Sequence, residues 1–192
     1  MKIKKIAMQL CLSSAVLAAI PTVFSAEVVP TTQHYMVKNL NIGDLPVKTI
    51  VPITAKTAEQ AIAQAQVIAS NPNADVAEFR IDLLEFSADT QKVIALGQQL
   101  NQILKEKPLI ATIRTHNEGG KMTVSDQDYE KIYSDYLKKP FMQLLDIEMF
   151  RDVGSVTKLI KLAHNKNVLV IMSNHDFAKT PEQQDIENRL LK

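Results

Sequence analysis

The chain has 192 residues, of which 46% are hydrophobic and 22% are charged, and its formal net charge is +1. These values are ordinary for a globular protein and exclude the collagen-like, disulfide-scaffold and disordered classes. Basic and acidic residues number 22 and 21, so no charge excess favours a nucleic-acid partner. The single cysteine, Cys11, cannot form an intramolecular disulfide, and no cysteine–histidine cluster has the spacing of a metal site.

Residues 1–26 have the three-part layout of a secretory signal peptide. Three lysines within the first five residues precede an apolar run from Ile6 to Ile20, and small residues follow up to Ala26. The run is shorter than the roughly 20 residues that span a membrane. We therefore expect cleavage near Ala26, with an uncleaved anchor as the weaker alternative, and one domain over residues 27–192 that is periplasmic or secreted, without stable membrane insertion.

The rest of the chain alternates apolar β-rich segments with segments of helical period, which predicts repeated βα units. Strands are predicted at residues 49–53, 75–81, 109–113, 143–147 and 168–172, and helices at 57–69, 89–104, 125–137 and 153–163. A fifth helix is predicted with Thr180 as its N-cap, Pro181 at its first helical position and Gln183 completing a capping box. Ahead of the first unit, weak alternation over residues 35–40 and a turn over residues 41–44 predict a short hairpin.

Strands of this apolar character are buried on both faces, as in a parallel sheet covered by helices. Two architectures fit the pattern: a complete, open, doubly wound sheet, or the first part of a (βα)8 TIM barrel. The predicted strands start about 30 residues apart, so eight units would need about 240 residues. About five units are present, and the barrel alternative therefore predicts a partial barrel that lacks the last three βα units.

The positions of the ionisable residues favour the barrel. Glu78, Arg80 and Asp82 are spaced by two along one predicted strand, so they share one face of the sheet. Charged or polar residues also stand at the ends of the next three strands: Arg114, Asp146, Glu148, Asn174, His175 and Asp176. Active sites of βα barrels lie at the carboxyl ends of the strands. The alternative is an ion network that only stabilises the sheet.

Four motifs resemble those of type I 3-dehydroquinate dehydratase. They are Glu78-Phe79-Arg80-Ile81-Asp82; Ile113-Arg114-Thr115 leading to Glu118-Gly119-Gly120; Leu145-Asp146-Ile147-Glu148; and Met172-Ser173-Asn174-His175-Asp176-Phe177 with Thr180-Pro181. The match covers roughly residues 35–192 in order and spacing. The resemblance implies a (βα)8 barrel, dimeric in its full-length form, that converts 3-dehydroquinate to 3-dehydroshikimate through an imine with a lysine. It implies no metal and no organic cofactor.

The resemblance also assigns roles to individual residues. His175 would be the general acid and base, and Glu118 the carboxylate that orients it. Glu78, Arg80 and Arg114 would bind the hydroxyl groups of the substrate. A histidine suits this reaction because a group that titrates near neutrality can remove one proton and donate another. Three further motif members, Asp82, Asp146 and Glu148, are expected to support these groups.

The imine-forming lysine of the family lies on the sixth strand, and the sequence ends at Lys192 within the fifth predicted helix. Lys192 is no substitute, because about 12 helical residues carry it roughly 18 Å from the start of that helix. We therefore expect a C-terminally truncated copy of the enzyme that is inactive by itself.

Two other functions compete with this expectation. A metal-dependent barrel enzyme could use Glu78, Asp82, Glu148, His175 and Asp176 as ligands of a divalent ion. The intervening Arg80 and Arg114 are unfavourable for such a site. A non-catalytic periplasmic binding protein, or a remnant of the enzyme, is the other alternative.

Overall fold

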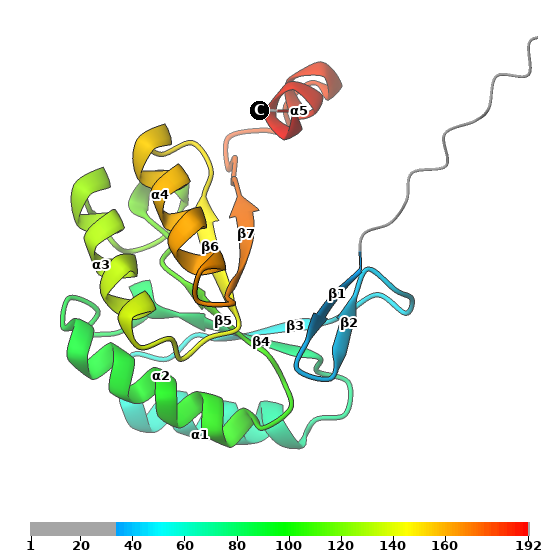
Figure 1. Cartoon of the computed structure of the whole chain (residues 1–192), viewed down its shortest axis with the longest axis vertical. Coiled ribbons are helices and arrows are strands. Elements are labelled where there is room, and N and C mark those ends of the chain that lie inside the picture. Colours follow the sequence, from blue (N-terminus) through cyan, green and yellow to red (C-terminus); the bar gives the residue numbers. More distant parts are fainter. Residues whose placement is uncertain (1–33, 192) are drawn as a thin grey trace, which may run out of the picture. The chain divides into compact units, whose positions relative to one another are not determined.

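The computed structural model describes residues 34–191, and the predicted signal peptide lies outside them. Within this range the chain forms β1 (Tyr35–Val37), β2 (Leu40–Ile42), β3 (Ile50–Ile53), α1 (Ala58–Ser70), β4 (Val76–Arg80), α2 (Thr90–Leu104), β5 (Leu109–Thr112), α3 (Asp126–Lys138), β6 (Leu144–Glu148), α4 (Val153–His164), β7 (Leu169–Ser173) and α5 (Gln183–Leu190). The five predicted strands and the four predicted helices before residue 164 are confirmed to within a few residues. Figure 1 shows α1 to α4 following the strands along one side of the sheet.

The order of the strands decides between the two predicted architectures. All five strands of the main sheet are parallel and pair in the order β3-β4-β5-β6-β7, so each strand lies beside its neighbour in sequence. A doubly wound sheet reverses its strand order at a switch point. A barrel wall does not, because every crossover proceeds in the same direction. The sheet is therefore the first five strands of a TIM-barrel wall.

The two faces of this sheet bury different side chains. On the outer face, Phe79, Ala111 and Leu145 are fully buried in the large core that the sheet shares with the helices. On the inner face, Ile110 and Leu144 belong to a smaller apolar cluster that also contains Val76 and Val37. Val37 comes from the β1–β2 hairpin, which therefore packs against the inner face. Below we call this smaller cluster the apolar floor.

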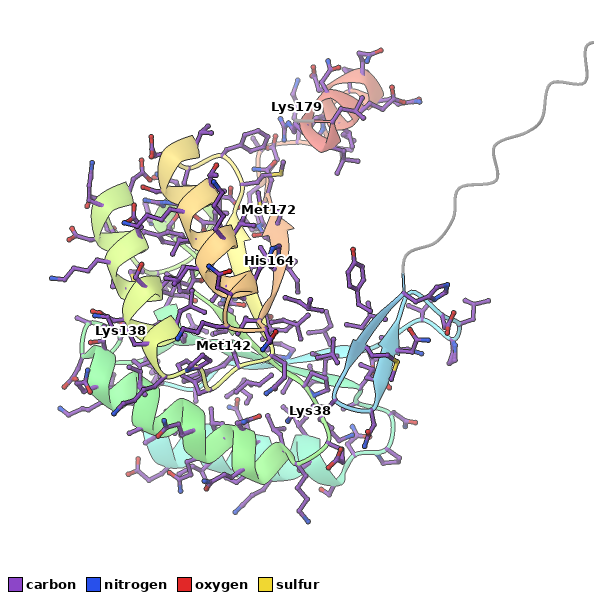
Figure 2. All side chains as sticks on the ribbon, viewed as in Figure 1. Lys38, Lys138, Met142, His164, Met172 and Lys179 are labelled. Atoms are coloured by element: carbon purple, nitrogen blue, oxygen red, sulfur yellow. The ribbon has the colours of Figure 1, made fainter. Side chains whose placement is uncertain are left out.

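The predicted hairpin is present, but its turn was placed wrongly. The structure turns at Lys38 and Asn39, between Val37 and its partner Leu40, and residues 40–42 form the second strand. Lys38 has φ = 51° and donates hydrogen bonds to Asn101 Oδ1 and to two backbone carbonyls just after α2. This contact with a distant helix fixes the turn (Lys38 is labelled in Figure 2), so local turn propensity did not reveal it.

The predicted start of the last helix is also wrong. The helix α5 begins at Gln183 with Glu182 as N-cap, and Glu182 makes no side-chain capping bond. No described residue of α5 is buried, so packing does not favour an earlier start.

The helix α3 opens the pairing between β5 and β6 where those strands end. Their ladder stops at Thr112 and Asp146. Beyond it the hydroxyl of Tyr133 accepts a hydrogen bond from Ile113 N (2.8 Å) and donates one to Asp146 O (2.8 Å). Tyr133 is fully buried, and burial raises the pKa of its phenol. One side chain thus replaces a direct strand–strand hydrogen bond and separates the two strand ends.

Tyr133→Phe should lower the free energy of unfolding by about 2 kcal/mol, because it leaves a buried N–H and a buried C=O without a partner. Tyr136→Phe on the same helix is the matched control. The hydroxyl of Tyr136 is buried without a hydrogen-bond partner among residues 34–191, so its removal should leave stability unchanged or increase it. Urea unfolding of both variants measures the difference, and equal losses would contradict this role of Tyr133.

Candidate active site

A buried arginine brings together the polar residues at the strand ends. Arg114, just past β5, donates to Asp146 Oδ1 (2.8 Å) and to Ser173 Oγ (2.9 Å). It also lies 3.4 Å from Glu148 Oε1 and 3.5 Å from Glu118 Oε2. Its side chain is 7% exposed. Residues from β6, β7 and the loop after β5 therefore meet at a single guanidinium, and we call these five residues the Arg114 cluster.

Glu118 joins the Arg114 cluster to His175. The Glu118 Oε2 atom accepts a hydrogen bond from the backbone N–H of His175 (3.1 Å) and lies 3.0 Å from its Nδ1. The other oxygen, Oε1, accepts a hydrogen bond from Asn174 Nδ2 (3.1 Å). With Nδ1 held by the carboxylate, the Nε2 atom points away from Glu118. This geometry suits a histidine that exchanges protons with a ligand through Nε2.

The loop that carries Glu118 is shaped by two glycines. Gly119 has φ = 81°, the left-handed conformation that glycine adopts without strain. A Cβ on Gly120 would lie 1.9 Å from the carbonyl oxygen of Arg114. The close approach of Gly120 to Arg114 is a tertiary feature. Together the two glycines return Glu118 to the arginine four residues earlier.

The second predicted strand, which is β4 in the structure, differs from the sequence prediction at Asp82. The strand β4 ends at Arg80, and residues 81–83 form a short 3₁₀ turn. The turn brings the buried Asp82 back to Arg80, whose Nε lies 2.8 Å from Asp82 Oδ1. Asp82 also accepts hydrogen bonds from the backbone N–H groups of Arg114 and Lys121. The prediction that Asp82 continues the strand face is therefore wrong, and Asp82 instead connects β4 to the loop of Glu118.

Glu78 and Arg80 adjoin the Arg114 cluster electrostatically. The hydrogen bond with Asp82 raises the pKa of Arg80, and the carboxylates of Glu78 and Asp146 add to this effect. Within residues 34–191 the side chain of Glu78 makes no hydrogen bond. Of the five predicted site residues, Arg114, Glu118 and His175 are thus in contact, Arg80 connects to Arg114 through Asp82, and Glu78 joins by charge alone.

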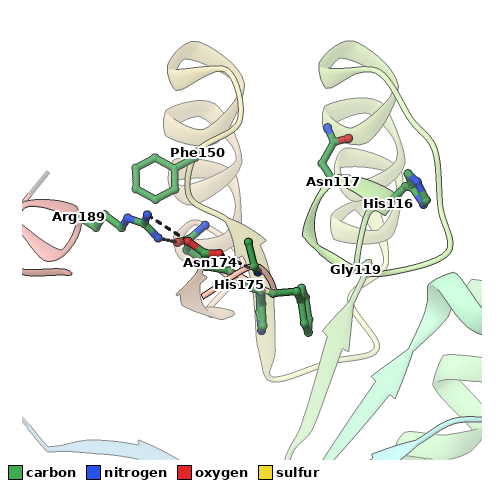
Figure 3. A pocket seen from close by; sticks show the side chains of 10 residues that line it. His116, Asn117, Gly119, Phe150, Asn174, His175 and Arg189 are labelled. Atoms are coloured by element: carbon green, nitrogen blue, oxygen red, sulfur yellow. Dashed lines mark hydrogen bonds and ion pairs between the residues drawn. The ribbon is translucent and has the colours of Figure 1, made fainter. Parts of the chain in front are cut away.

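His175 lines three hollows at the carboxyl end of the sheet. One has a volume of about 720 Å³ and is lined by His116, Asn117, Phe150 and Asn174 among others (Figure 3). Another, of about 440 Å³, is lined by Glu118 and Glu148 besides His175. From α5, Arg189 donates to Asn174 Oδ1 (3.0 Å) and pairs with Asp176 (3.4 Å). The histidine is thus open to a small ligand, with its side chain 40% exposed.

Sequence reasoning gave no role to three residues of this region. Ser173 links Arg114 to Asp146 Oδ1 (2.9 Å), and the period of two along β7 could have placed it on the inner face. Asn174 was noted only as a strand-end residue. Arg151 contacts Glu148 from the loop after β6, where no periodicity predicts an orientation.

The described residues contain no group of three or more His, Cys, Asp or Glu that could hold a metal ion. Three of the four carboxylates of the metal alternative, those of Asp82, Glu148 and Asp176, have other partners. Glu148 accepts from Thr115 N and Thr115 Oγ1, each at 2.7 Å, and Asp176 accepts from Ala178 N. None of the helices within residues 34–191 combines the length and the apolar character needed to cross a membrane.

Comparison with known proteins identifies similar sequences and structures. The family described as type I 3-dehydroquinase matches residues 49–192. The "Catabolic 3-dehydroquinate dehydratase" of Acinetobacter baylyi is 72% identical over 178 residues, which are 92% of this chain and 65% of that protein. The 3-dehydroquinate dehydratase of Enterococcus faecalis is 40% identical over 81% of this chain and 61% of its own length. This chain thus spans just under two thirds of these relatives.

Solved structures agree with the sequence matches. The structure of the Enterococcus faecalis 3-dehydroquinate dehydratase superposes with a TM-score of 0.78 at 40% identity, over 81% of this chain and 65% of that chain. A type I 3-dehydroquinate dehydratase of Clostridium difficile, solved with covalently modified comenic acid, gives a TM-score of 0.80 at 31% identity, over 83% of this chain and 63% of that one. The partial TIM barrel of this chain therefore has a counterpart within the solved structures of these two proteins.

The titration of Asp146 should make stability depend on pH. Burial raises the pKa of its carboxyl, against the lowering effects of Arg114 and Ser173. The folded protein then holds this proton more tightly than the unfolded chain, so this contribution to stability falls as pH rises from the ordinary pKa of 3.8 through the raised one. Asp146→Asn removes the titration.

Urea unfolding of the wild type and of Asp146→Asn at about pH 4 and about pH 6 measures this effect. The stability difference between the two proteins should shift in favour of the variant at the higher pH. A shift in favour of the wild type would show that Arg114 outweighs burial.

Proposed function

Because the chain belongs to the type I 3-dehydroquinase family, we propose that the protein eliminates water from 3-dehydroquinate to give 3-dehydroshikimate. The observation that carries this proposal is the pairing of His175 with the buried Glu118 beside the Arg114 cluster. The pair lies at the carboxyl ends of parallel strands, where barrel enzymes bind their substrates. The relatives named above, which share the fold and the motifs, are called 3-dehydroquinate dehydratases.

His175 acts as general base and then as general acid in this proposal. Its Nε2 removes a proton from the carbon next to the substrate carbonyl carbon, and the same nitrogen returns a proton to the departing hydroxyl group, which leaves as water. Glu118 holds Nδ1 and stabilises the ring while it carries both protons. Because one group performs both transfers, the reaction needs no net proton from solvent.

The charge of the site supports the imine chemistry that the family implies. Five carboxylates, those of Glu78, Asp82, Glu118, Asp146 and Glu148, face three guanidinium groups, those of Arg80, Arg114 and Arg151. With a neutral His175 the formal charge of this group is −2. A lysine ammonium, or the cationic imine that it forms with a ketone, would be stabilised beside such an excess. We propose that this lysine belongs to the sixth βα unit of the family fold.

Glu78, Arg80 and Arg114 are proposed to bind the hydroxyl groups of the substrate, to different extents. Arg80 keeps 23% of its side chain exposed and Glu78 is half-buried, so both can reach a ligand. Arg114 exposes 7% of its side chain and already binds Asp146 and Ser173. We therefore assign Arg114 mainly to holding the carboxylates in place, with direct substrate contact as the smaller part of its role.

We also propose export and a catabolic role. The Acinetobacter baylyi relative, which is named as catabolic, matches 178 of the 192 residues of this chain and leaves 14 unmatched. That number is smaller than the 26 residues of the expected signal peptide, so part of the leader has a counterpart in the relative. A periplasmic or secreted enzyme would meet its substrate outside the cytoplasm. The homodimer implied by the resemblance stays a prediction.

One experiment distinguishes the proposed function from the alternative, which is binding without catalysis. A chain that also carries the sixth βα unit, and with it the lysine, is mixed with 3-dehydroquinate, binding is measured by calorimetry, and formation of the conjugated product is followed by ultraviolet absorbance. We expect binding with turnover. Binding without turnover would favour the non-catalytic alternative, and the absence of both would contradict the proposed function.

His175→Gln should reduce turnover about a thousandfold, and Glu118→Gln about a hundredfold, because proton transfer by a positioned base contributes on this scale. Both variants should still bind the substrate. The control is His164→Gln, an exposed residue at the end of α4, which should leave turnover unchanged. Full activity in His175→Gln would exclude this histidine as the acid and base.

A further inference from the structure

Arg151 contacts Glu148 of the Arg114 cluster and lines the same hollow as His175. It lies in the turn between β6 and α4, and its side chain is 9% exposed. Its NH1 group lies 3.3 Å from Glu148 Oε2. The same guanidinium donates to Val124 O (3.0 Å), pairs with Asp126 (2.8 Å) and lies 4.4 Å from the centre of the Tyr129 ring. A cation held this firmly beside a buried carboxylate adds a fixed charge to the site.

Glu148 is the carboxylate through which Arg151 can affect the site. It is 1% exposed, and its two oxygens have separate sets of donors. Oε1 accepts from Thr115 N (2.7 Å) and lies 3.4 Å from Arg114 NH1, whereas Oε2 accepts from Thr115 Oγ1 (2.7 Å) and from Arg151. Two arginines therefore share one carboxylate, one at each oxygen.

The binding of Glu148 by two arginines affects the site because Arg114 also contacts Glu118. The NH1 group of Arg114 lies within 3.5 Å of Glu148, Glu118 and Ser173, so its position is a compromise among three acceptors. Without Arg151, Glu148 would face Arg114 as its only cation. Arg114 would then move toward Glu148, since a bidentate pair is the stronger geometry, and its contact with Glu118 would lengthen.

We propose that Arg151 is a positioning residue which, by binding one oxygen of Glu148, keeps Arg114 within reach of Glu118 and so fixes the carboxylate that orients His175. This inference rests on the proposed function for its catalytic meaning. The predicted consequence is a change at the ring of His175, which can be observed without measuring turnover.

A purely structural role of Arg151 is the competing explanation. Its contacts with Val124, Asp126 and Tyr129 join α3 and the loop before it to the turn after β6, and such contacts stabilise a fold whatever the site does. Asp126→Asn separates the two roles. It removes the outer ion pair of Arg151, on a carboxylate that is 39% exposed, and leaves the contact with Glu148 in place.

The experiment is proton–nitrogen NMR of the histidine ring in the full chain, with thermal unfolding measured in parallel. In the wild type the Nδ1–H of His175 should give a downfield signal from its hydrogen bond with Glu118. Arg151→Met should remove or strongly shift this signal, Arg151→Lys should restore most of it because the charge is retained, and Asp126→Asn should leave it in place. A signal that is unchanged in a folded Arg151→Met variant would overturn the proposal.

The double variant Arg151→Met with Glu148→Gln keeps the proposal testable if Arg151→Met does not fold, because it removes the unpaired buried charge together with its partner. If Arg151 acts through Glu148, adding Arg151→Met to Glu148→Gln should cause no further change of the His175 signal. A further loss of the signal in the double variant would show that Arg151 acts by another route. Absence of turnover in the wild type would contradict the proposed function and leave these ring signals interpretable.

Discussion

The burial of one guanidinium among carboxylates from separate chain segments is the constraint on which the polar half of this structure depends. Arg114 cannot lose its charge, and an unpaired cation at 7% exposure would cost several kcal/mol. Asp146, Glu148 and Glu118 must therefore stay beside it, the first two reaching it from β6 and Glu118 from the loop after β5. The ends of β5 and β6 and the loop of Glu118 are positioned by this one requirement.

The inner face of the sheet is consequently divided into two levels. Near the start of the strands, Val76, Ile110 and Leu144 form the apolar floor, which the hairpin covers. Two residues further along each strand the side chains become polar, as in Asp146 after Leu144 and in Thr112 after Ile110. The period of two directs both levels toward the same side. The floor excludes water from below, which strengthens the electrostatic interactions of the upper level.

The tyrosines of α3 bind backbone groups at the point where the regular sheet ends and the irregular site begins. Tyr133 inserts its hydroxyl between the ends of β5 and β6, and Tyr129 accepts a hydrogen bond from Glu148 N (3.2 Å). Backbone groups that leave the ladder are thereby satisfied from the outer face, while the side chains of Arg114 and Glu148 remain inside. The helix layer thus contributes to the site without contacting a ligand.

The sequence by itself determined the units, the class of the fold and the residues that could act chemically. Periodicity of 2 and 3.6 depends only on neighbouring residues, which is why the five strands and most helix positions were predictable. The spacing of Glu78 and Arg80, and the strand-end positions of Arg114 and His175, were predictable for the same reason. Motif order added Glu118, which lies in a loop that periodicity does not describe.

Only the tertiary structure decided the strand order, the hairpin turn at Lys38, the return of Asp82 to Arg80 and the two-sided binding of Glu148 by Arg114 and Arg151. Each of these depends on groups that are distant in sequence or outside any repeating pattern. A buried charge selects whichever partner the packed chain brings within hydrogen-bond distance, and no local pattern records that choice. The ionisable residues at the strand ends could therefore be found in the sequence, whereas the contributions of Ser173 and Arg151, and the pairing of all these groups, had to come from the fold.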